Sequence, residues 1–382
     1  MTSPAAADSA FAADLDRVLA AGPGSLVFSP ASIAAALRLA LLGARGDTAA
    51  ELVAVLHAAK PEEAAEGLRL IGELWAESAG PGPAGEDSGL AFRAPNTVWV
   101  QTGLALRPQY TDAVNSLASA ALHGTDFAAA PDEARRDINT VIAEQTAGKI
   151  TDLLAPGTIQ AATRLVFANA VYLKAAWAHP FPAAATSDAS FHPAPGQERA
   201  VPMMHLTARL GYLRGDGYQA VTLPYRGGPL AMTVVLPDGP PGDFGPVTGQ
   251  LAIAGLAGLL AGATGRQVRL ALPRFHLETQ LGLVPVLQQL GMVQAFGGDA
   301  DFAGITDATR LAIGAVAHSA YIDVDEEGTE AAAATGITMA AMAMVREQAA
   351  EVTVDRPFLF AITDTVTGLP LFLGRVTDPA AG

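Results

Sequence analysis

Apolar residues near the N-terminus recur with the spacing of an amphipathic helix. Phe11, Leu15, Val18 and Leu19 lie at positions i, i+4, i+7 and i+8, and the pattern stops near Gly22. Residues with this spacing share one face of an α-helix. The pattern therefore predicts an N-terminal helix that buries this face.

A second helix is predicted directly after a short apolar strand at residues 26–28. Ser29 followed by Pro30 is a typical helix start, because serine caps free N–H groups and proline suits the first turn. This helix is predicted to end at Gly43, and its apolar face consists of Ile33, Leu37, Ala40 and Leu41.

The rest of the chain alternates between strand and helix patterns. Residues 96–101 and 163–173 are rich in β-branched and aromatic side chains, which predicts strands, and between them a helical pattern ends at Gly148. The second half is mainly β, with a hairpin predicted from residues 220–224 and 230–236. No fixed-period repeat is visible, so the pattern predicts an α+β fold with large antiparallel sheets.

The composition favours one large folded unit. Half of the 382 residues are apolar and 16% are charged, which is enough for a large core and argues against disorder. The clearest linker-like stretch is the Gly- and Pro-rich segment 79–85, and it is short. We therefore predict a single domain over residues 1–382.

The net charge of the chain argues against several classes of binding partner. The net charge is -15, and the basic residues do not cluster. Nucleic acid, heparin-like polyanions and acidic membranes attract positive surfaces, so we expect none of them to bind. The longest apolar run, residues 251–264, is too short and too rich in alanine and glycine to span a bilayer. We expect a soluble monomer.

The N-terminus bears on the compartment, whereas the absence of cysteine gives no information about it. The chain has no cysteine, which excludes disulfides, thiolate metal sites and a cysteine nucleophile. The first basic residue is Arg17, so the start lacks the basic and then apolar pattern of a signal peptide. We predict a cytoplasmic protein, or an extracellular one if a signal was removed.

Enzyme and metal motifs are missing from the sequence. It holds no G-x-S-x-G or H-E-x-x-H motif, and Lys149 is followed by Ile150, where a phosphate loop needs Ser or Thr. The acidic segment from Asp323 resembles the start of a calcium loop, but its twelfth position is Ala334 instead of glutamate. We therefore expect no enzyme activity, no metal and no cofactor.

The segment 326–339 carries an alanine run that admits more than one structure. Alanine favours a helix. With period two, however, one face is uncharged and mostly small, and Glu330 falls on the other face. This pattern could enter a sheet, yet the β-propensity of alanine is low, so the segment could equally remain an exposed loop. The uncharged face consists of Thr329, Ala331, Ala333, Thr335, Ile337 and Met339.

Residues 325–335 (DEEGTEAAAAT) resemble the hinge of inhibitory serpins, in which small residues let a cleaved loop insert as an extra strand. Further segments resemble serpin motifs in the family's order, and the similarity spans residues 10–379. These segments are 27–33 (VFSPASI), 139–154, 169–181 (NAVYLKAAWAHPF), 201–204, 273–275, 290–292, 356–358 and 372–376.

The resemblance implies a fold and a reactive loop. The serpin fold has three β-sheets, about eight or nine helices and an exposed reactive-centre loop, here about residues 326–346. The hinge of this loop would consist of Glu327, Gly328, Thr329, Glu330, Ala331, Ala332, Ala333, Ala334 and Thr335.

The resemblance also implies two regions in the sheet that accepts the loop. At the shutter, where the sheet opens, the family has a buried hydrogen-bond network, and Ser29, Ser32, Asn169 and His318 match its positions. At the breach, where the loop first enters, Trp177 matches the family's tryptophan. The residues alone favour a plain structural role for two of these, with Ser29 as a helix cap and His318 as a satisfied core histidine. Trp177 can serve ordinary core packing as well as the breach.

The resemblance implies inhibition of a serine protease through a covalent acyl complex. Counting fifteen residues from Gly328 places the scissile bond between Met342 and Ala343, which suits elastase-, chymotrypsin- or subtilisin-like targets. Bonds after Met339, Met344 and Arg346 remain alternatives. The rival functions are a non-inhibitory serpin acting as a binding or chaperone-like protein, and a hydrolase.

Overall fold

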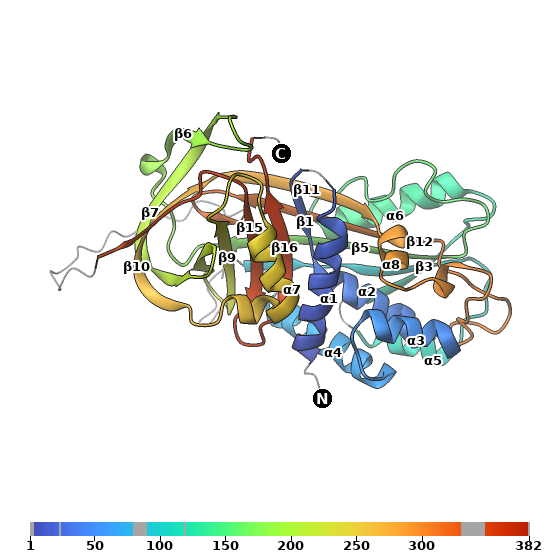
Figure 1. Cartoon of the computed structure of the whole chain (residues 1–382). Coiled ribbons are helices and arrows are strands. Elements are labelled where there is room, and N and C mark those ends of the chain that lie inside the picture. Colours follow the sequence, from blue (N-terminus) through green and yellow to red (C-terminus); the bar gives the residue numbers. More distant parts are fainter. Residues whose placement is uncertain (1–3, 23, 79–89, 118–119, 330–347, 381–382) are drawn as a thin grey trace.

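A computed structural model describes residues 4–22, 24–78, 90–117, 120–329 and 348–380 (Figure 1). Within these residues the chain forms eight α-helices, two short 3-10 helices and sixteen strands, so the predicted α+β class is confirmed. The helices are α1 (Pro4–Leu19), α2 (Pro30–Gly43), α3 (Gly46–Val55), α4 (Pro61–Ser78), α5 (Pro108–Asn115), α6 (Pro131–Gln145), α7 (Gly245–Leu259) and α8 (Val284–Gln289). The 3-10 helices are η1 (Ala183–Ala185) and η2 (Gln294–Phe296).

The central sheet has seven strands, and six of them follow the order β11-β12-β13-β5-β3-β4, while β2 also pairs with β5. Parallel and antiparallel pairs are mixed, because β12 runs parallel to β5 whereas β3 runs antiparallel to it. Its strands are β2 (Leu90–Arg93), β3 (Asn96–Gln101), β4 (Ala120–Thr125), β5 (Leu165–Ala176), β11 (Phe275–Gly282), β12 (Ala315–Val324) and β13 (Gly328–Thr329).

The other nine strands form one connected network, in which β7 is the longest strand. The long strand β7 pairs with β10 along most of its length and with β8 only over Gly211–Arg214. By hydrogen bonding the described strands therefore make two sheets, of seven and nine strands, where three sheets were expected, because β7 links β6 and β10 to β8 within one network. The strands are β1 (Leu26–Phe28), β6 (Ser187–Phe191), β7 (Arg199–Arg214), β8 (Tyr218–Pro224), β9 (Leu230–Pro237), β10 (Thr264–Pro273), β14 (Ala350–Thr353), β15 (Phe358–Asp364) and β16 (Pro370–Val376).

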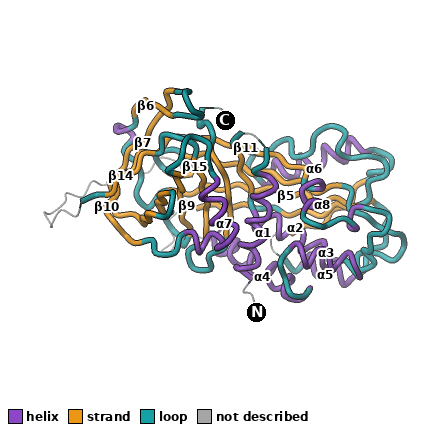
Figure 2. Tube along the Cα trace, in the orientation of Figure 1, coloured by secondary structure: helices purple, strands orange, loops and turns teal. Residues whose placement is uncertain are grey.

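The two faces of the central sheet are covered by different helices. Side chains alternate between the faces of a strand, so Phe167 and Val171 of β5 pack into the main core, whereas Val166, Ala168 and Ala170 pack into a second cluster with α6. In Figure 1, α6 lies on one side of the sheet and α2 on the other. Figure 2 shows the strands as the middle of the molecule, with α2 to α5 gathered on one side.

Helix α2 begins and ends where the sequence predicts. Helix α2 begins at Pro30, and the Oγ of Ser29 accepts a hydrogen bond of 3.2 Å from the backbone N–H of Ser32. This is the predicted N-cap. The helix ends at Gly43, and all but one of its residues are buried, because it lies between the central sheet and the other helices.

Candidate functional site

The central sheet is closed in its middle and opened at one end. Strands β12 and β5 pair directly from Ala315 opposite Val166 as far as Tyr321 opposite Tyr172. Beyond this point the two residues of β13 lie between them. Because β13 is antiparallel to both neighbours, the chain enters the sheet from its end and points toward its middle.

Gly328 and Thr329, which form β13, fit this opening closely. A Cβ atom on Gly328 would lie 2.0 Å from the carbonyl oxygen of Ala175, so only glycine permits this approach. Thr329 lies opposite Ala175 on β5 and Val324 on β12, and it is fully buried. Its hydroxyl is 2.7 Å from the hydroxyl of Tyr225, which satisfies both buried polar groups.

The turn that leads into β13 is held by a carboxylate and an ion pair. The Oδ1 atom of Asp325 accepts hydrogen bonds from the backbone N–H groups of Glu327 and Gly328, at 2.8 and 3.1 Å. The carboxylate of Glu326 accepts bonds of 2.7 to 3.0 Å from Arg274 and a further bond from the hydroxyl of Thr186. Burial alone would raise the pKa of Glu326, but these hydrogen bonds lower it, so the group is ionised.

Trp177 lies directly against this turn. Its indole N–H donates to the carbonyl oxygen of Asp325 at 2.9 Å, and its backbone N–H donates to that of Glu327 at 2.8 Å. The ring is fully buried and stacks on Tyr225 at a centroid distance of 4.6 Å. Tyr225 in turn meets Thr329, so one aromatic stack supports both the turn and the strand.

The middle of the sheet contains a buried row of polar side chains on three neighbouring strands. His318 of β12 lies opposite Asn169 of β5, which lies opposite Asn96 of β3. The Nδ2 group of Asn169 donates to Asn96 Oδ1 at 2.6 Å and to Ser32 Oγ at 2.5 Å. The backbone N–H of Ser29 donates to His318 Nε2 at 3.0 Å. The row therefore joins the sheet to the start of α2.

These contacts fix the protonation state of His318. An N–H group of Ser29 can only donate, so Nε2 accepts and the ring proton sits on Nδ1, where it is donated to Asn169 Oδ1. Complete burial lowers the pKa of His318 to about 3. The histidine is therefore neutral in the folded protein at neutral pH.

Comparison with known families matches residues 6–379 to the model of the serpin (serine protease inhibitor) family. The chain belongs to the serpin family. It is 39% identical to an uncharacterized serpin-like protein of Thermococcus kodakarensis, over 97% of this chain and 85% of that protein. It is 34% identical to the leukocyte elastase inhibitor of Bos taurus, over 99% of this chain and 100% of that protein. The crystal structure of Serpin48 from the insect Tenebrio molitor superposes with a TM-score of 0.85, at 30% identity and 97% coverage of each chain.

The structure of this serpin brings some of the predicted site residues together. Ser29, Ser32, Asn169 and His318 form one connected network, and Trp177 lies beside the turn that leads into β13. Of the predicted hinge, Glu327, Gly328 and Thr329 lie in the described part of the chain. The other hinge residues lie outside it, as do the predicted bond and its alternatives: Glu330, Ala331, Ala332, Ala333, Ala334, Thr335, Met339, Met342, Ala343, Met344 and Arg346.

Sequence reasoning missed two members of this serpin's site. Asn96 opens the predicted strand 96–101, and nothing local distinguishes it from a polar strand end. Its role comes from its register against Asn169, 73 positions away in the chain. Tyr225 was likewise absent from the sequence prediction, because its contacts with Trp177 and Thr329 join distant segments.

The described residues of this serpin contain neither of two further kinds of feature, a metal cluster or a membrane-spanning helix. Among them, no group of three or more histidines, cysteines and carboxylates could hold a metal ion. In the same residues, no helix is both long and apolar enough to cross a membrane.

Proposed function

We propose that this serpin is an irreversible inhibitor of elastase-, chymotrypsin- or subtilisin-like serine proteases, through cleavage of its loop between Met342 and Ala343 and insertion of the loop into the central sheet. The observation that carries the proposal is β13, because Gly328 and Thr329 already lie between β12 and β5 as the start of an inserted strand. Similarity to an inhibitor of leukocyte elastase supports the target class.

The register of β13 supports the path of insertion. Thr329 lies opposite Ala175 and Val324, so each further residue of an antiparallel strand would move one position back along both neighbours. Ala332 would then separate the present pair of Tyr172 and Tyr321, and Thr335 would separate Asn169 from His318. The register of β13 against β5 and its register against β12 predict the same position for each further residue. The strand can therefore continue without a bulge.

The side-chain pattern supports the same path. Thr329 points to the core face of the sheet, where it meets Tyr225. With period two, Ala331, Ala333 and Thr335 would follow on that face, all small and uncharged, while Glu330 would fall on the other face. The hydroxyl of Thr335 would arrive at the polar row and could replace the hydrogen bonds that the separation of Asn169 and His318 breaks.

The target protease supplies the reactive groups for cleavage of the loop. Its serine Oγ attacks the carbonyl carbon of Met342, the peptide bond breaks, and Ala343 leaves with a protonated amine while Met342 stays as an ester. Insertion of fourteen residues at about 3.3 Å each would carry the ester roughly 46 Å. Distortion of the protease then displaces the donors of its oxyanion hole, which water needs to hydrolyse the ester.

Incubation with pancreatic elastase, chymotrypsin, subtilisin and trypsin, followed by denaturing gels and mass spectrometry, tests the proposal. We expect a complex that survives SDS and a released peptide that begins at Ala343. Each protease with its active-site serine blocked is the control, and it should form no such complex. If every protease cuts the loop and stays active, the inhibitor assignment fails. The non-inhibitory alternative, a binding or chaperone-like protein, then takes its place.

We also propose that inhibition needs no heparin and that the monomer is the active form. The net charge of -15 supports the first point, because a polyanion would be repelled. Titration of the inhibition rate with heparin checks it, and a steep rise in rate would overturn it. Size-exclusion chromatography with light scattering checks the monomer.

A further inference from the structure

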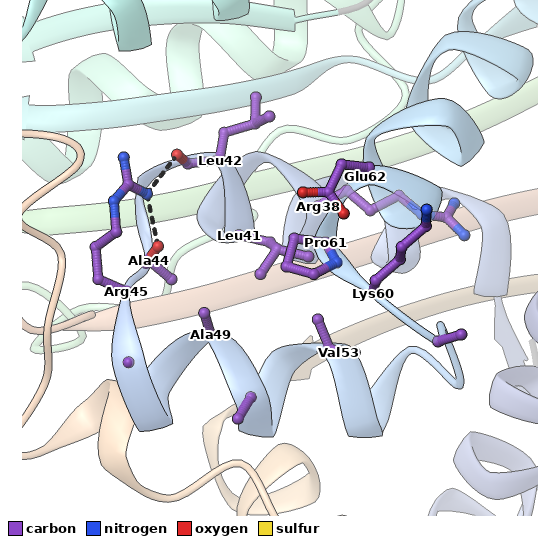
Figure 3. Close-up of a pocket in the computed structure, with 13 residues that line it drawn as sticks. Arg38, Leu41, Leu42, Ala44, Arg45, Ala49, Val53, Lys60, Pro61 and Glu62 are labelled. Carbon is purple, nitrogen blue, oxygen red and sulfur yellow. Dashed lines mark hydrogen bonds between the residues drawn. The ribbon is translucent and has the colours of Figure 1, made fainter.

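A groove of about 640 Å³ lies between α2, α3 and the start of α4, away from β13 and the polar row (Figure 3). Its apolar lining comes from all three helices and includes Leu41, Leu42, Ala49, Val53 and Pro61. This volume and this mostly apolar lining are typical of sites for small molecules.

A buried arginine with unused donors belongs to the lining. The side chain of Arg38 is only 3% exposed, and its Nη2 atom donates to the carboxylate of Asp8. Its Nε and Nη1 atoms are buried and have no hydrogen-bond partner among the described residues. Helix α4 makes room for the guanidinium with Gly67, where a Cβ atom would lie 2.8 Å from Cζ. Buried donors without a partner cost free energy, which an incoming acceptor would recover.

The lining of the groove is cationic although the whole chain is acidic. It includes Arg45, Lys60 and Arg38, of which Arg38 is paired with Asp8, against one carboxylate in the lining, that of Glu62, while the net charge of the chain is -15. Figure 3 shows Lys60 and Arg38 toward one end and Arg45 at the other, where it donates to the carbonyl oxygens of Leu42 and Ala44. Helix α4 begins at Pro61 in this lining, so its positive N-terminal end adds to the field.

We propose that this groove binds a small amphipathic carboxylate of the fatty-acid type. The carboxylate would lie at the end with Lys60 and Arg38, where it would meet the ammonium group of Lys60, the N–H groups of Arg38 that have no partner and the start of α4. The hydrocarbon would lie along Leu41, Ala49 and Val53. A neutral apolar ligand would leave the cationic end unused, and a polyanion would gain nothing from the apolar walls. The site does not depend on protease inhibition.

Isothermal titration calorimetry with decanoate, below its micellar concentration, tests the proposal on the full chain. We expect saturable binding of one decanoate, and at least ten-fold weaker binding of decanol. Lys60→Glu should weaken decanoate binding at least ten-fold, and Val53→Trp, which fills the groove, should abolish it. The matched controls Arg310→Glu and Val366→Trp change exposed residues outside the lining and should bind as the parent does. Circular dichroism shows whether each variant is folded.

Three results would overturn the proposal. The first is the absence of saturable binding to the parent. The second is equal affinity for decanoate and decanol, because the cationic end would then play no part. The third is unchanged binding by folded Val53→Trp, because decanoate would then bind elsewhere. Since the readout is binding, failure of the inhibition assay would not affect it.

Discussion

The open end and the closed middle of the pairing between β12 and β5 are built differently. At the breach, β13 is inserted and is held by one buried hydroxyl pair and by the ion pair of Glu326 with the half-exposed Arg274. At the shutter, β12 and β5 are joined directly, and the row of Asn96, Asn169 and His318 is buried and uncharged. The sheet is therefore open where one of its contacts, the ion pair of Arg274, reaches solvent, and closed where the whole polar row is buried.

Under the proposed function, this difference indicates where insertion of the loop would meet its barrier. Separation of Asn169 from His318 leaves buried polar groups without partners, at about 1 to 3 kcal/mol each. At the breach the corresponding separation has already occurred, and Thr329 fills the gap. Under the proposed function, the breach decides whether a strand can enter, and the shutter decides how readily it proceeds.

Thr329→Arg should have the largest effect, because it blocks the open end. The side chain at this position is fully buried against Tyr225, so a guanidinium there would lose its hydration without gaining an anionic partner. We expect proteases to cleave the loop as before while the yield of SDS-stable complex falls at least ten-fold. Thr329→Ser keeps the hydroxyl and is the control. Inhibition by the arginine variant at the parent's rate would rule out insertion through this opening.

Asn169→Leu should be the most destabilising change at the closed middle. It removes the hydrogen bonds to Ser32, Asn96 and His318 and leaves these groups buried. We expect a loss of about 3 kcal/mol in the free energy of unfolding, measured by chemical denaturation. Asn115→Leu is the control, since Asn115 is exposed at the end of α5. Similar losses in both variants would mean that the polar row contributes little.

The residues of the two regions also differ in how far the sequence alone predicts their roles. Local rules predicted the cap of α2 at Ser29, and the family's motifs pointed to Asn169 and His318, because these signals lie within short segments. Asn96 and Tyr225 carry no such signal, since their roles arise from contacts between segments far apart in the chain. The period-two pattern from Thr329 predicted a face that could enter a sheet, but only the register of β13 shows how far it enters.

The neutral state of His318, in the middle of the sheet, predicts that the free energy of unfolding depends on pH. Its pKa is about 3 when folded, against 6.5 as the ordinary value, so the unfolded chain binds the extra proton between these values. Stability from this group is therefore present above pH 6.5 and falls as the pH drops. Asp16 acts in the opposite direction, because burial, opposed by Arg375, raises the pKa of its carboxyl to about 6.

The variant His318→Gln separates the contribution of His318 to this pH dependence from that of the other titrating groups. We expect the stability difference between the parent and His318→Gln to shrink by about 1 to 2 kcal/mol from pH 6.5 to pH 5, since one pH unit corresponds to at most ~1.4 kcal/mol. Chemical denaturation at both pH values measures it. Asn115→Leu, which changes an exposed residue that does not titrate, should differ from the parent by the same amount at both pH values. A constant difference for His318→Gln would contradict the neutral buried state.

Arg274→Met should have the smallest effect, because it acts at the accessible end. The carboxylate of Glu326 is 7% exposed, but the arginine side chain is 48% exposed, so solvent screens the pair and only about 1 kcal/mol is expected from its loss. The loss should exceed that of Arg269→Met, which removes an ion pair with Glu351 whose partners are both mostly exposed. Thermal unfolding of the two variants compares them. If Arg274→Met instead destabilised the protein as much as Asn169→Leu, the breach would be as firmly held as the shutter, and the barrier to insertion would have to be assigned to both.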